Sequence, residues 1–481
     1  MKTLSHTSVI IATTLACCFQ PLRAADAQTR PNFIFYLTDD ISASDFGCYG
    51  SDVVQTPHVD RLARDGMLFS RAYLTTSSCS PTRCSIITAR YPHNTGACEL
   101  HTPLPADQYM FPQALKESGY YTVLAGKNHM GPAVQQAFDV VMGGKGPGGQ
   151  EQWVQLLRDR PKDKAFFCWF ASYDAHRGWS FDDKAPVYDP DKVEVPPFLF
   201  DGPKTRKDLA DYYHEVSRSD YYLGELRKEL ERQGIADNTY IIYISDNGRP
   251  FPRCKTRLYD SGIRTPFVVY GPKVAAGAKS DSLVSVIDIG PTVLELAGVK
   301  ADPRMQGVSF TAVLQDPEAV VRDYVFAEHN WHVFQAHERM VRTGDWLYIR
   351  NAFPERVNMC VEAKRYPAGG ELWHHYREGN LKPEQTDIMR QPRPAEELYN
   401  VADDPYQFDN LASDPKHAVA LKRLRGILDT WTKQTCDDVP QTPTPDRPPS
   451  GKIGHQPGGV MPGIASGAPR CNDPGPIRVA E

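Results

Sequence analysis

Runs of apolar residues that end in polar clusters constrain the fold of this chain more than any other feature. The runs at 32–37, 166–170 and 239–244 are continuous rather than alternating. This pattern is typical of strands buried on both faces of a parallel sheet. The polar clusters that follow these runs are Asp39-Asp40, Asp174-Ala175-His176 and Asp246-Asn247-Gly248. Because ligands bind beyond the carboxyl ends of such strands, we expect the three clusters to contribute to one site.

Helical segments alternate with these strands. Residues 57–66, 207–233 and 286–297 have helical periodicity with stop signals behind them. A further buried strand is expected at 122–125. Strands that alternate with helices predict an α/β fold with a doubly wound, mostly parallel sheet flanked by helices.

The character of the sequence changes after about residue 320. Short strand-like runs at 324–327 and 346–349 precede a helical pattern at 417–432. We therefore expect a catalytic α/β domain at 28–320 and a smaller C-terminal α+β subdomain at 321–436. Proline and glycine dominate from Asp437 onward, so residues 437–481 are expected to form a poorly ordered tail.

The first 27 residues have the pattern of a signal peptide. Lys2 is followed by an apolar segment at 9–19 and by Ala25-Asp26-Ala27, which fits a cleavage site. We expect an exported protein, secreted or periplasmic, that begins near Gln28. Removing the segment leaves 9 of the 11 cysteines, so at least one is unpaired or modified in an oxidising compartment.

The cysteine spacing gives little support to a zinc site, since the chain has no C-x-x-C pair. Cys436 and Cys471 flank part of the proline-rich tail, and a disulfide between them is one hypothesis.

Composition excludes several classes of protein. The formal net charge is −5, and no lysine and arginine block forms a basic stripe, which argues against a nucleic-acid binder. No apolar run reaches eighteen residues, so no transmembrane anchor is expected. Apolar residues make up 41% of the chain, which is enough for a large core.

The most specific motif is Cys79-Ser80-Pro81-Thr82-Arg83, followed by Thr88-Ala89-Arg90. It resembles the signature of the sulfatase family within the alkaline phosphatase superfamily. Alanine at 89 departs from the glycine that the family usually has there. The other motifs of the family occur in the family's order, as Asp39-Asp40, Gly126-Lys127-Asn128-His129, Asp174-Ala175-His176, Asp246-Asn247-Gly248 and Lys255.

The resemblance extends from Pro31 to about residue 430. Within the family the chain is most similar to N-sulfoglucosamine sulfohydrolases. The segments that carry this closer similarity are 127–132, 174–177 and 250–259.

The resemblance implies a formylglycine nucleophile. In the family, the motif cysteine is converted by a formylglycine-generating enzyme, here at Cys79. The remaining catalytic candidates are Arg83, Lys127, His129, His176 and Lys255. Their positive charges and donors suit a tetrahedral sulfate. His129 or His176 would protonate the leaving group with assistance from Lys255, and the individual roles stay open.

A metal site is predicted from the same clusters. Asp39, Asp40, Asp246 and Asn247 offer only oxygen ligands, which hard cations prefer. We expect Ca²⁺, with Mg²⁺ as the alternative, and residue 79 as an additional ligand. Residue 79 should lie at the N-terminus of a helix that extends toward Arg90, because Pro81 suits a first helical turn.

Substrate contacts are expected from a polar and aromatic segment at 329–339. His329, His332 and Arg339 are the candidates, with Arg339 binding an anion and Trp331 providing a stacking platform. The alternative is an ordinary surface loop.

Three functions compete. The first is a sulfohydrolase that releases sulfate from a sulfated sugar, preferably an N-sulfated amino sugar at a chain end. The second is a phosphodiesterase or phosphonate monoester hydrolase, which uses similar metal and nucleophile chemistry. The third is a non-catalytic sugar-binding protein, although binding alone requires no nucleophile.

Overall fold

The computed structural model describes residues 30–357 and 359–447. The expected signal peptide at 1–27 and Cys471 therefore lie outside the described residues. Within the described part, no helix is both long enough and apolar enough to cross a membrane.

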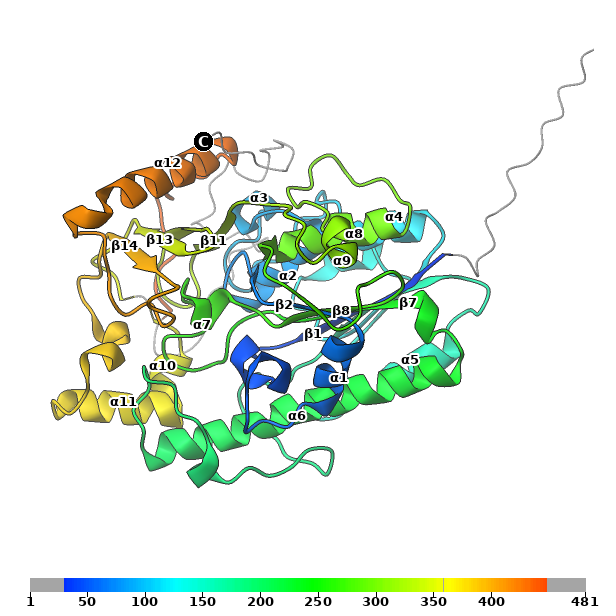
Figure 1. The fold of residues 1–481 in the computed structure, drawn as a ribbon, viewed down its shortest axis with the longest axis horizontal. Coiled ribbons are helices and arrows are strands. Elements are labelled where there is room, and N and C mark those ends of the chain that lie inside the picture. Colours follow the sequence, from blue (N-terminus) through cyan, green and yellow to red (C-terminus); the bar gives the residue numbers. More distant parts are fainter. Residues whose placement is uncertain (1–29, 358, 448–481) are drawn as a thin grey trace, which may run out of the picture.

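A mixed, mostly parallel sheet of eight strands forms the centre of the described structure, in the order β5-β4-β6-β1-β7-β8-β2-β9 (Figure 1). β1 pairs in parallel with both β6 and β7, whereas β8 is antiparallel to β7. The bounds are β1 Asn32–Thr38, β2 Met67–Phe69, β4 Tyr121–Gly126, β5 Val140–Met142, β6 Phe166–Ala171, β7 Thr239–Ser245, β8 Phe267–Tyr270 and β9 Ala278–Ser280. The predicted doubly wound α/β fold is confirmed.

The two faces of the sheet bury two separate cores. Along β1, Phe33, Phe35 and Leu37 enter one core, whereas Ile34 and Tyr36 enter the other. This follows from the alternation of side chains along a strand, and it explains why the run is continuously apolar.

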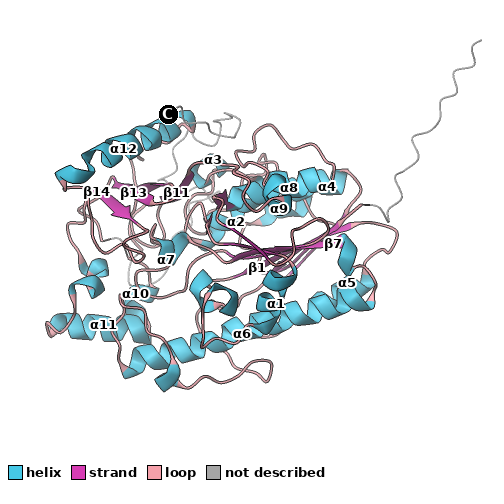
Figure 2. Ribbon diagram, viewed as in Figure 1, coloured by secondary structure: helices cyan, strands magenta, loops and turns pink. Residues whose placement is uncertain are grey.

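Helices cover both faces (Figure 2). Those that contribute to the first core are α2 (Cys79–Thr88), α4 (Phe111–Glu117), α8 (Ile289–Leu296) and α9 (Thr311–Gln315). Those that contribute to the second are α1 (Pro57–Asp65), α5 (Trp153–Asp159) and α6 (Pro203–Arg232). Helix α6 begins four residues before the expected start, because Pro203 occupies its first turn, where a missing N–H costs little.

Short elements complete the α/β part. They are α3 (Pro92–Thr95), α7 (Asp260–Ile263), β3 (Ala72–Tyr73) and β10 (Val284–Ser285). The last two pair in a separate two-stranded sheet.

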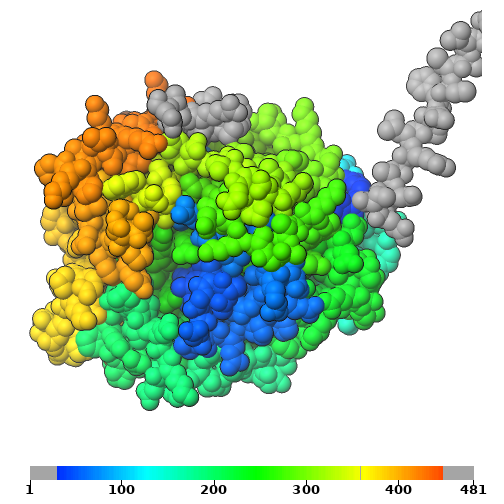
Figure 3. All heavy atoms as spheres, in the orientation of Figure 1, coloured from blue at the N-terminus to red at the C-terminus, as the bar shows by residue number. Residues whose placement is uncertain are grey.

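The smaller subdomain is built on a four-stranded antiparallel sheet, β11-β12-β13-β14. Its strands are β11 (Val325–His329), β12 (Glu338–Arg342), β13 (Trp346–Asn351) and β14 (Glu396–Asn400). Helix α12 (Ala418–Gln434) covers this sheet through Leu424, Leu428 and Trp431. Helices α10 (Glu362–Arg365) and α11 (Pro367–Arg377) extend the subdomain toward α6. The yellow and orange residues in Figure 3 show this subdomain at one end of the molecule.

The chain after α12 differs from expectation. Residues 437–447 pack against the subdomain rather than forming a loose tail. The Trp331 indole donates a hydrogen bond to the carbonyl oxygen of Pro445 (2.8 Å). The backbone N–H of Arg447 donates a hydrogen bond to the carbonyl oxygen of Val333 (2.7 Å). The expectation of poor order is therefore wrong for 437–447, while 448–481 lie outside the described residues.

Candidate active site

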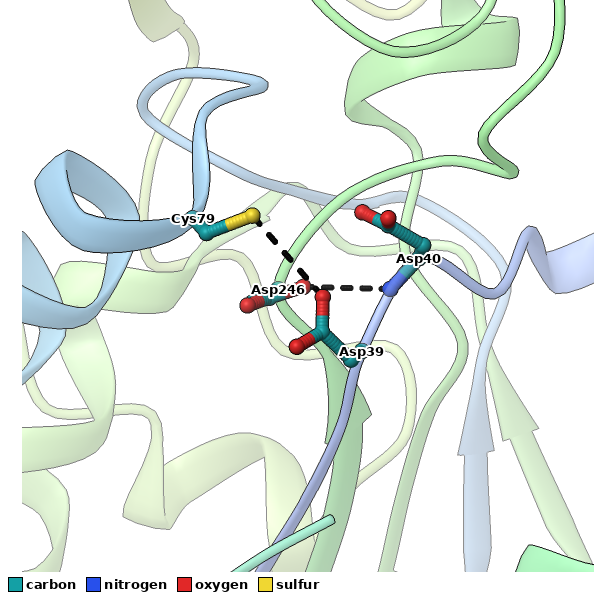
Figure 4. A group of neighbouring side chains, drawn as sticks. All are labelled: Asp39, Asp40, Cys79 and Asp246. Carbon is teal, nitrogen blue, oxygen red and sulfur yellow. Dashed lines mark hydrogen bonds between the residues drawn. The ribbon is translucent and has the colours of Figure 1, made fainter. Parts of the chain in front are cut away.

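Four acidic or sulfur-bearing side chains converge at the carboxyl end of the sheet. Asp39, Asp40, Cys79 and Asp246 each place one ligand atom within 4.8 Å of the others (Figure 4). We call these four residues the strand-end cluster. All are buried. They come from the ends of β1 and β7 and from the start of α2, so the fold brings together segments far apart in sequence.

The register of the sheet explains this convergence. Thr38 of β1 lies opposite Ser245 of β7, so the next residues, Asp39 and Asp246, leave the sheet at the same level. The backbone N–H of Asp40 then donates to a carboxylate oxygen of Asp246 (3.2 Å). Parallel strands in register therefore form the acidic part of the cluster.

Helix α2 positions Cys79, the candidate nucleophile. The helix begins at Cys79 and carries Pro81 in its first turn, which confirms the predicted helix. Free N–H groups and the helix dipole favour negative charge at this end. Cys84 is fully buried in the first core, as expected of a packing residue.

Ala89 ends α2 in a left-handed conformation with φ of 54°. The family's usual glycine would adopt this conformation without strain. A Cβ atom on the facing Gly290 would lie 3.0 Å from the Ala89 Cβ, so the absence of a side chain at 290 gives Ala89 its space.

Three cations surround the cluster. Arg83 donates from Nε to Asp246 Oδ2 (2.8 Å), and Lys127 pairs with Asp39. Lys255 donates to Asp40 Oδ2 at 2.6 Å. Each cation lies within a water-poor environment, where charge-assisted hydrogen bonds are strong. The arrangement supplies positive charge on more than one side of residue 79.

The donor set fits a hard divalent cation. Asn247 donates to Asp40 Oδ1 (3.0 Å) and to the Cys79 sulfur (3.2 Å), so it lies against the cluster. Its own amide oxygen is buried with no hydrogen-bond partner among the described residues. Several carboxylates plus a spare amide oxygen are typical ligands for Ca²⁺ or Mg²⁺. The residues present therefore match the predicted metal site.

The two candidate histidines are both held in the neutral form. Burial and the charges of Lys255 and Lys127 lower the pKa of His176 to about 4. Its Nδ1 lies 2.6 Å from the Arg177 carbonyl oxygen, which can only accept, so Nδ1 carries the proton. Burial and Lys127 lower the pKa of His129 well below its ordinary value.

Two neighbouring residues were not found from the sequence. His101 Nδ1 lies 2.7 Å from His129 Nε2, and the backbone N–H of His101 donates to Ser80 Oγ (2.7 Å). Glu362 of the subdomain places Oε1 3.7 Å from Lys255 Nζ. Neither residue belongs to a recognisable motif, and both reach the site from distant segments.

The candidates at 329–339 separate into two groups. His332 hydrogen-bonds through Nδ1 to Ser78 Oγ (2.6 Å), directly before Cys79. His329 pairs instead with Glu338 (3.4 Å), and Arg339 forms a two-contact ion pair with Asp437. Trp331 is only 2% exposed, so it has no open face for stacking. The structure thus brings His332, but not Arg339 or Trp331, to the start of α2.

The sequence of this chain matches two protein-family models. The family model described as Sulfatase matches residues 31–148 and 150–299. The chain belongs to the sulfatase family. A second model, N-sulphoglucosamine sulphohydrolase, C-terminal, matches residues 254–369. This match includes Lys255 and the first part of the smaller subdomain.

Curated relatives of this sulfatase are enzymes. The human N-sulphoglucosamine sulphohydrolase is 28% identical over 494 residues, covering 88% of this chain and 94% of the relative. An ulvan-active sulfatase of Formosa agariphila is 30% identical over 434 residues, covering 85% of this chain and 81% of the relative.

Solved structures share the fold at lower identity. A structure in complex with its substrate D-glucosamine-2-N,6-O-disulfate gives a TM-score of 0.64 at 21% identity, covering 85% of this chain and 99% of that one. A phosphonate monoester hydrolase of Agrobacterium radiobacter gives 0.64 at 19% identity, covering 84% and 96%. At these identities the likeness shows the α/β architecture alone.

Proposed function

We propose that this sulfatase releases inorganic sulfate from a sulfated amino sugar, preferably the N-sulfate of a terminal N-sulfoglucosamine. The observation that carries the proposal is the position of Cys79. Cys79 starts helix α2, and its sulfur lies within 4.8 Å of carboxylate oxygens of Asp39, Asp40 and Asp246. Arg83, Lys127 and Lys255 pair with these carboxylates. A candidate nucleophile, ligands that suit a cation, and donors that suit an anion therefore lie close together in a buried region, which supports the proposal.

An unmodified thiol suits this site poorly. Burial raises the pKa of the Cys79 thiol to about 12, so little thiolate forms at neutral pH. As formylglycine, produced by a formylglycine-generating enzyme during maturation, residue 79 would supply a hydroxyl to attack sulfur and a second hydroxyl whose ionisation expels sulfate.

The cation would be Ca²⁺, with Mg²⁺ as the alternative. Asp39, Asp40, Asp246 and Asn247 would hold it together with residue 79. Bound there, it would supply Lewis-acid polarisation of a sulfate oxygen.

The remaining residues bind the anion and manage protons. Arg83 and Lys127 are already fixed on the Asp246 and Asp39 side, where they would stabilise charge on the sulfate oxygens. Lys255 lies on the Asp40 side, and His176 lies near Lys255, Lys127 and Asp39. His176 is neutral with its proton on Nδ1, so it must first take up a proton at Nε2 before it could protonate a leaving group.

The choice of an amino sugar rests on sequence similarity. Residues 254–369 match the C-terminal model of N-sulphoglucosamine sulphohydrolases, and the human enzyme of that name aligns over most of the chain. The subdomain also places His332 and Glu362 beside the site, which suits a pocket for a terminal sugar. Export through the segment at 1–27, to a secreted or periplasmic location, would bring the enzyme to such substrates.

Sulfate release from matched substrates tests the proposal. The protein would be co-expressed with a formylglycine-generating enzyme and assayed on N-sulfoglucosamine, glucosamine-6-sulfate and a phosphonate monoester. We expect sulfate from N-sulfoglucosamine at the highest kcat/KM. Faster cleavage of the 6-O-sulfate without N-sulfate cleavage would contradict the substrate assignment, and faster hydrolysis of the phosphonate would favour the phosphonate hydrolase.

A further inference from the structure

A buried carboxylate reaches the active site from the smaller subdomain. Glu362 is the first residue of α10 and is 7% exposed. Its Oε1 lies 3.7 Å from Lys255 Nζ, the same ammonium that pairs with Asp40. Glu362 is therefore one lysine away from the strand-end cluster, on the Asp40 side.

The second oxygen of this carboxylate lacks a strong hydrogen-bond donor among the described residues. Glu362 Oε2 is buried and accepts no hydrogen bond within the described part of the chain. Cys360 lies close enough for the charge of Glu362 to raise the pKa of its already buried thiol, but a thiol is a weak donor. A buried acceptor without a strong donor is costly, and such exceptions require an explanation.

The carboxylate is ionised despite its burial. Burial alone would raise the pKa of Glu362, but the charge of Lys255 outweighs it, so the pKa lies below its usual range. His176 and Arg177 act in the same direction. Lys255, His176 and Glu362 therefore form one group that combines two potential donors with one anionic acceptor.

We propose that Glu362 determines specificity by accepting a hydrogen bond from the leaving nitrogen of an N-sulfated substrate. This inference rests on the proposed function and extends it from a substrate class to a residue that selects it. The free Oε2 would receive the N–H that a sulfamate carries and an O-sulfate ester lacks.

The chemistry of the two leaving groups explains the selection. When the sulfur–nitrogen bond breaks, its electron pair stays on nitrogen, which takes up a proton from His176 protonated at Nε2. Sulfur meanwhile bonds to the residue-79 oxygen, whose hydroxyl proton passes to a neighbouring base or solvent. The resulting amine gains a further proton at neutral pH and becomes an ammonium, which a carboxylate stabilises. An oxygen leaving group instead develops negative charge, which the same carboxylate repels.

A charge-neutralising substitution tests the role. In Glu362→Gln the side-chain volume is kept and the anion is removed. We expect the ratio of kcat/KM for N-sulfoglucosamine to that for glucosamine-6-sulfate to fall by about 10- to 100-fold, as a lost charged hydrogen bond does. Turnover of an aryl sulfate, which also has an oxygen leaving group, should fall much less than turnover of N-sulfoglucosamine.

Glu371→Gln is the matched control. Glu371 is equally buried and lies on the next helix, but its carboxylate is satisfied by the backbone N–H of Thr205 (2.7 Å). We expect this variant to leave the substrate ratio unchanged, even if its melting temperature falls. An equal change of ratio in both variants would assign the effect to a general disturbance of the subdomain and overturn the proposal.

Product binding provides a second readout. Wild-type enzyme should bind glucosamine, a cation at neutral pH, at least about 10-fold more tightly than glucose, and Glu362→Gln should lose this preference. An unchanged preference, or equal losses on N- and O-sulfated substrates, would overturn the role of Glu362 alone. A wild type that cleaves aryl sulfate but no N-sulfate would overturn the substrate assignment and this inference with it.

Discussion

The strand-end cluster and the buried cluster around Arg339 contain similar residue types but differ in how their charges are matched. Arg339 holds Asp437 through two hydrogen bonds, Nε to Oδ2 at 2.5 Å and Nη2 to Oδ1 at 2.8 Å. At the strand ends, three carboxylates and a thiol converge. Arg83, Lys127 and Lys255 each pair with one of the carboxylates, but the Asn247 amide oxygen beside them lacks a partner among the described residues. The Arg339–Asp437 pair is satisfied by its own two hydrogen bonds, whereas the strand-end cluster keeps an unused amide oxygen beside converging carboxylates, as expected of a cation site.

Asp437 and Asp40, one carboxyl from each cluster, differ in the direction of their pKa shifts. Within the strand-end cluster Asp39 differs from Asp40, because the surrounding cations, Lys127 foremost, together outweigh burial and lower the pKa of Asp39. At Asp437 the charge of Arg339 outweighs burial, and the pKa lies below its usual range. At Asp40 burial, with the charges of Asp39 and Asp246, raises the pKa despite Lys255. Buried charge alone therefore does not mark a site in this protein. The convergence of several carboxylates is what distinguishes the candidate metal site from the Arg339–Asp437 pair.

The largest effect should come from residue 79. Cys79→Ala keeps the fold and the side chains of Asp39, Asp40, Asp246 and Asn247 but removes the nucleophile, so turnover of any sulfated substrate should fall by several orders of magnitude. Cys84→Ala, on the same helix but in the core, should retain most activity at some cost in stability. Initial rates of the two variants at equal folded concentration check this, and equal losses in both would contradict it.

Removing a carboxylate from the strand-end cluster should greatly weaken metal binding. Asp246→Ala deletes a ligand and also leaves Arg83 without its closest acceptor. We expect weak Ca²⁺ binding by calorimetry and activity near that of chelator-treated enzyme, with the circular dichroism spectrum retained. Normal turnover by this variant in chelator would show that the cluster is not a metal site.

Breaking the completed cluster should affect stability rather than chemistry. Arg339→Leu strands the buried Asp437 carboxylate, and we expect a loss of about 3–5 kcal/mol in the free energy of unfolding. Denaturant titration measures this, with Arg339→Leu/Asp437→Leu as a partner variant that should recover much of the loss. A fall in kcat/KM with unchanged stability would instead support a role for Arg339 in substrate binding.

The smallest effect concerns Glu99, which contacts the segment after α12. Its carboxylate accepts a hydrogen bond from Thr444 (2.6 Å), and burial raises its pKa to about 7. The folded state thus holds a proton that the unfolded state releases near pH 4.5. This stabilisation is complete below that pH and is lost as the pH rises through 7.

Glu99→Gln should therefore be more stable than wild type by about 1–3 kcal/mol at pH 8 and similar to it at pH 4.5. Chemical denaturation at the two pH values measures the difference. A stability difference that does not change with pH would contradict the assignment of this titration to Glu99.

The sequence allowed the strands and their polar ends to be predicted because continuous apolar runs reflect burial on both faces. Asp39 and Asp246 could be placed at one edge for that reason, and the structure aligns them through the β1–β7 register. His101 and Glu362 could not be found, because each approaches through a loop or short helix whose path depends on tertiary packing.

The sequence predicts Arg339 as a substrate-binding residue, but the structure places it in an ion pair with Asp437. An arginine among histidines and aromatics resembles an anion-binding group until its partner is known, and Asp437 lies 98 residues further along the chain. For residues 437–447, the proline-rich composition correctly indicates the lack of helices and strands. It carries no information about whether residues such as Thr444 pack against the fold.

The mass of the peptide that contains residue 79, measured on active enzyme purified after co-expression with a formylglycine-generating enzyme, tests the central claim most directly. The account predicts an aldehyde in place of the Cys79 thiol, in a fraction that rises in proportion to the rate of sulfate release across preparations. Full activity in a preparation whose Cys79 remains entirely a thiol would contradict it.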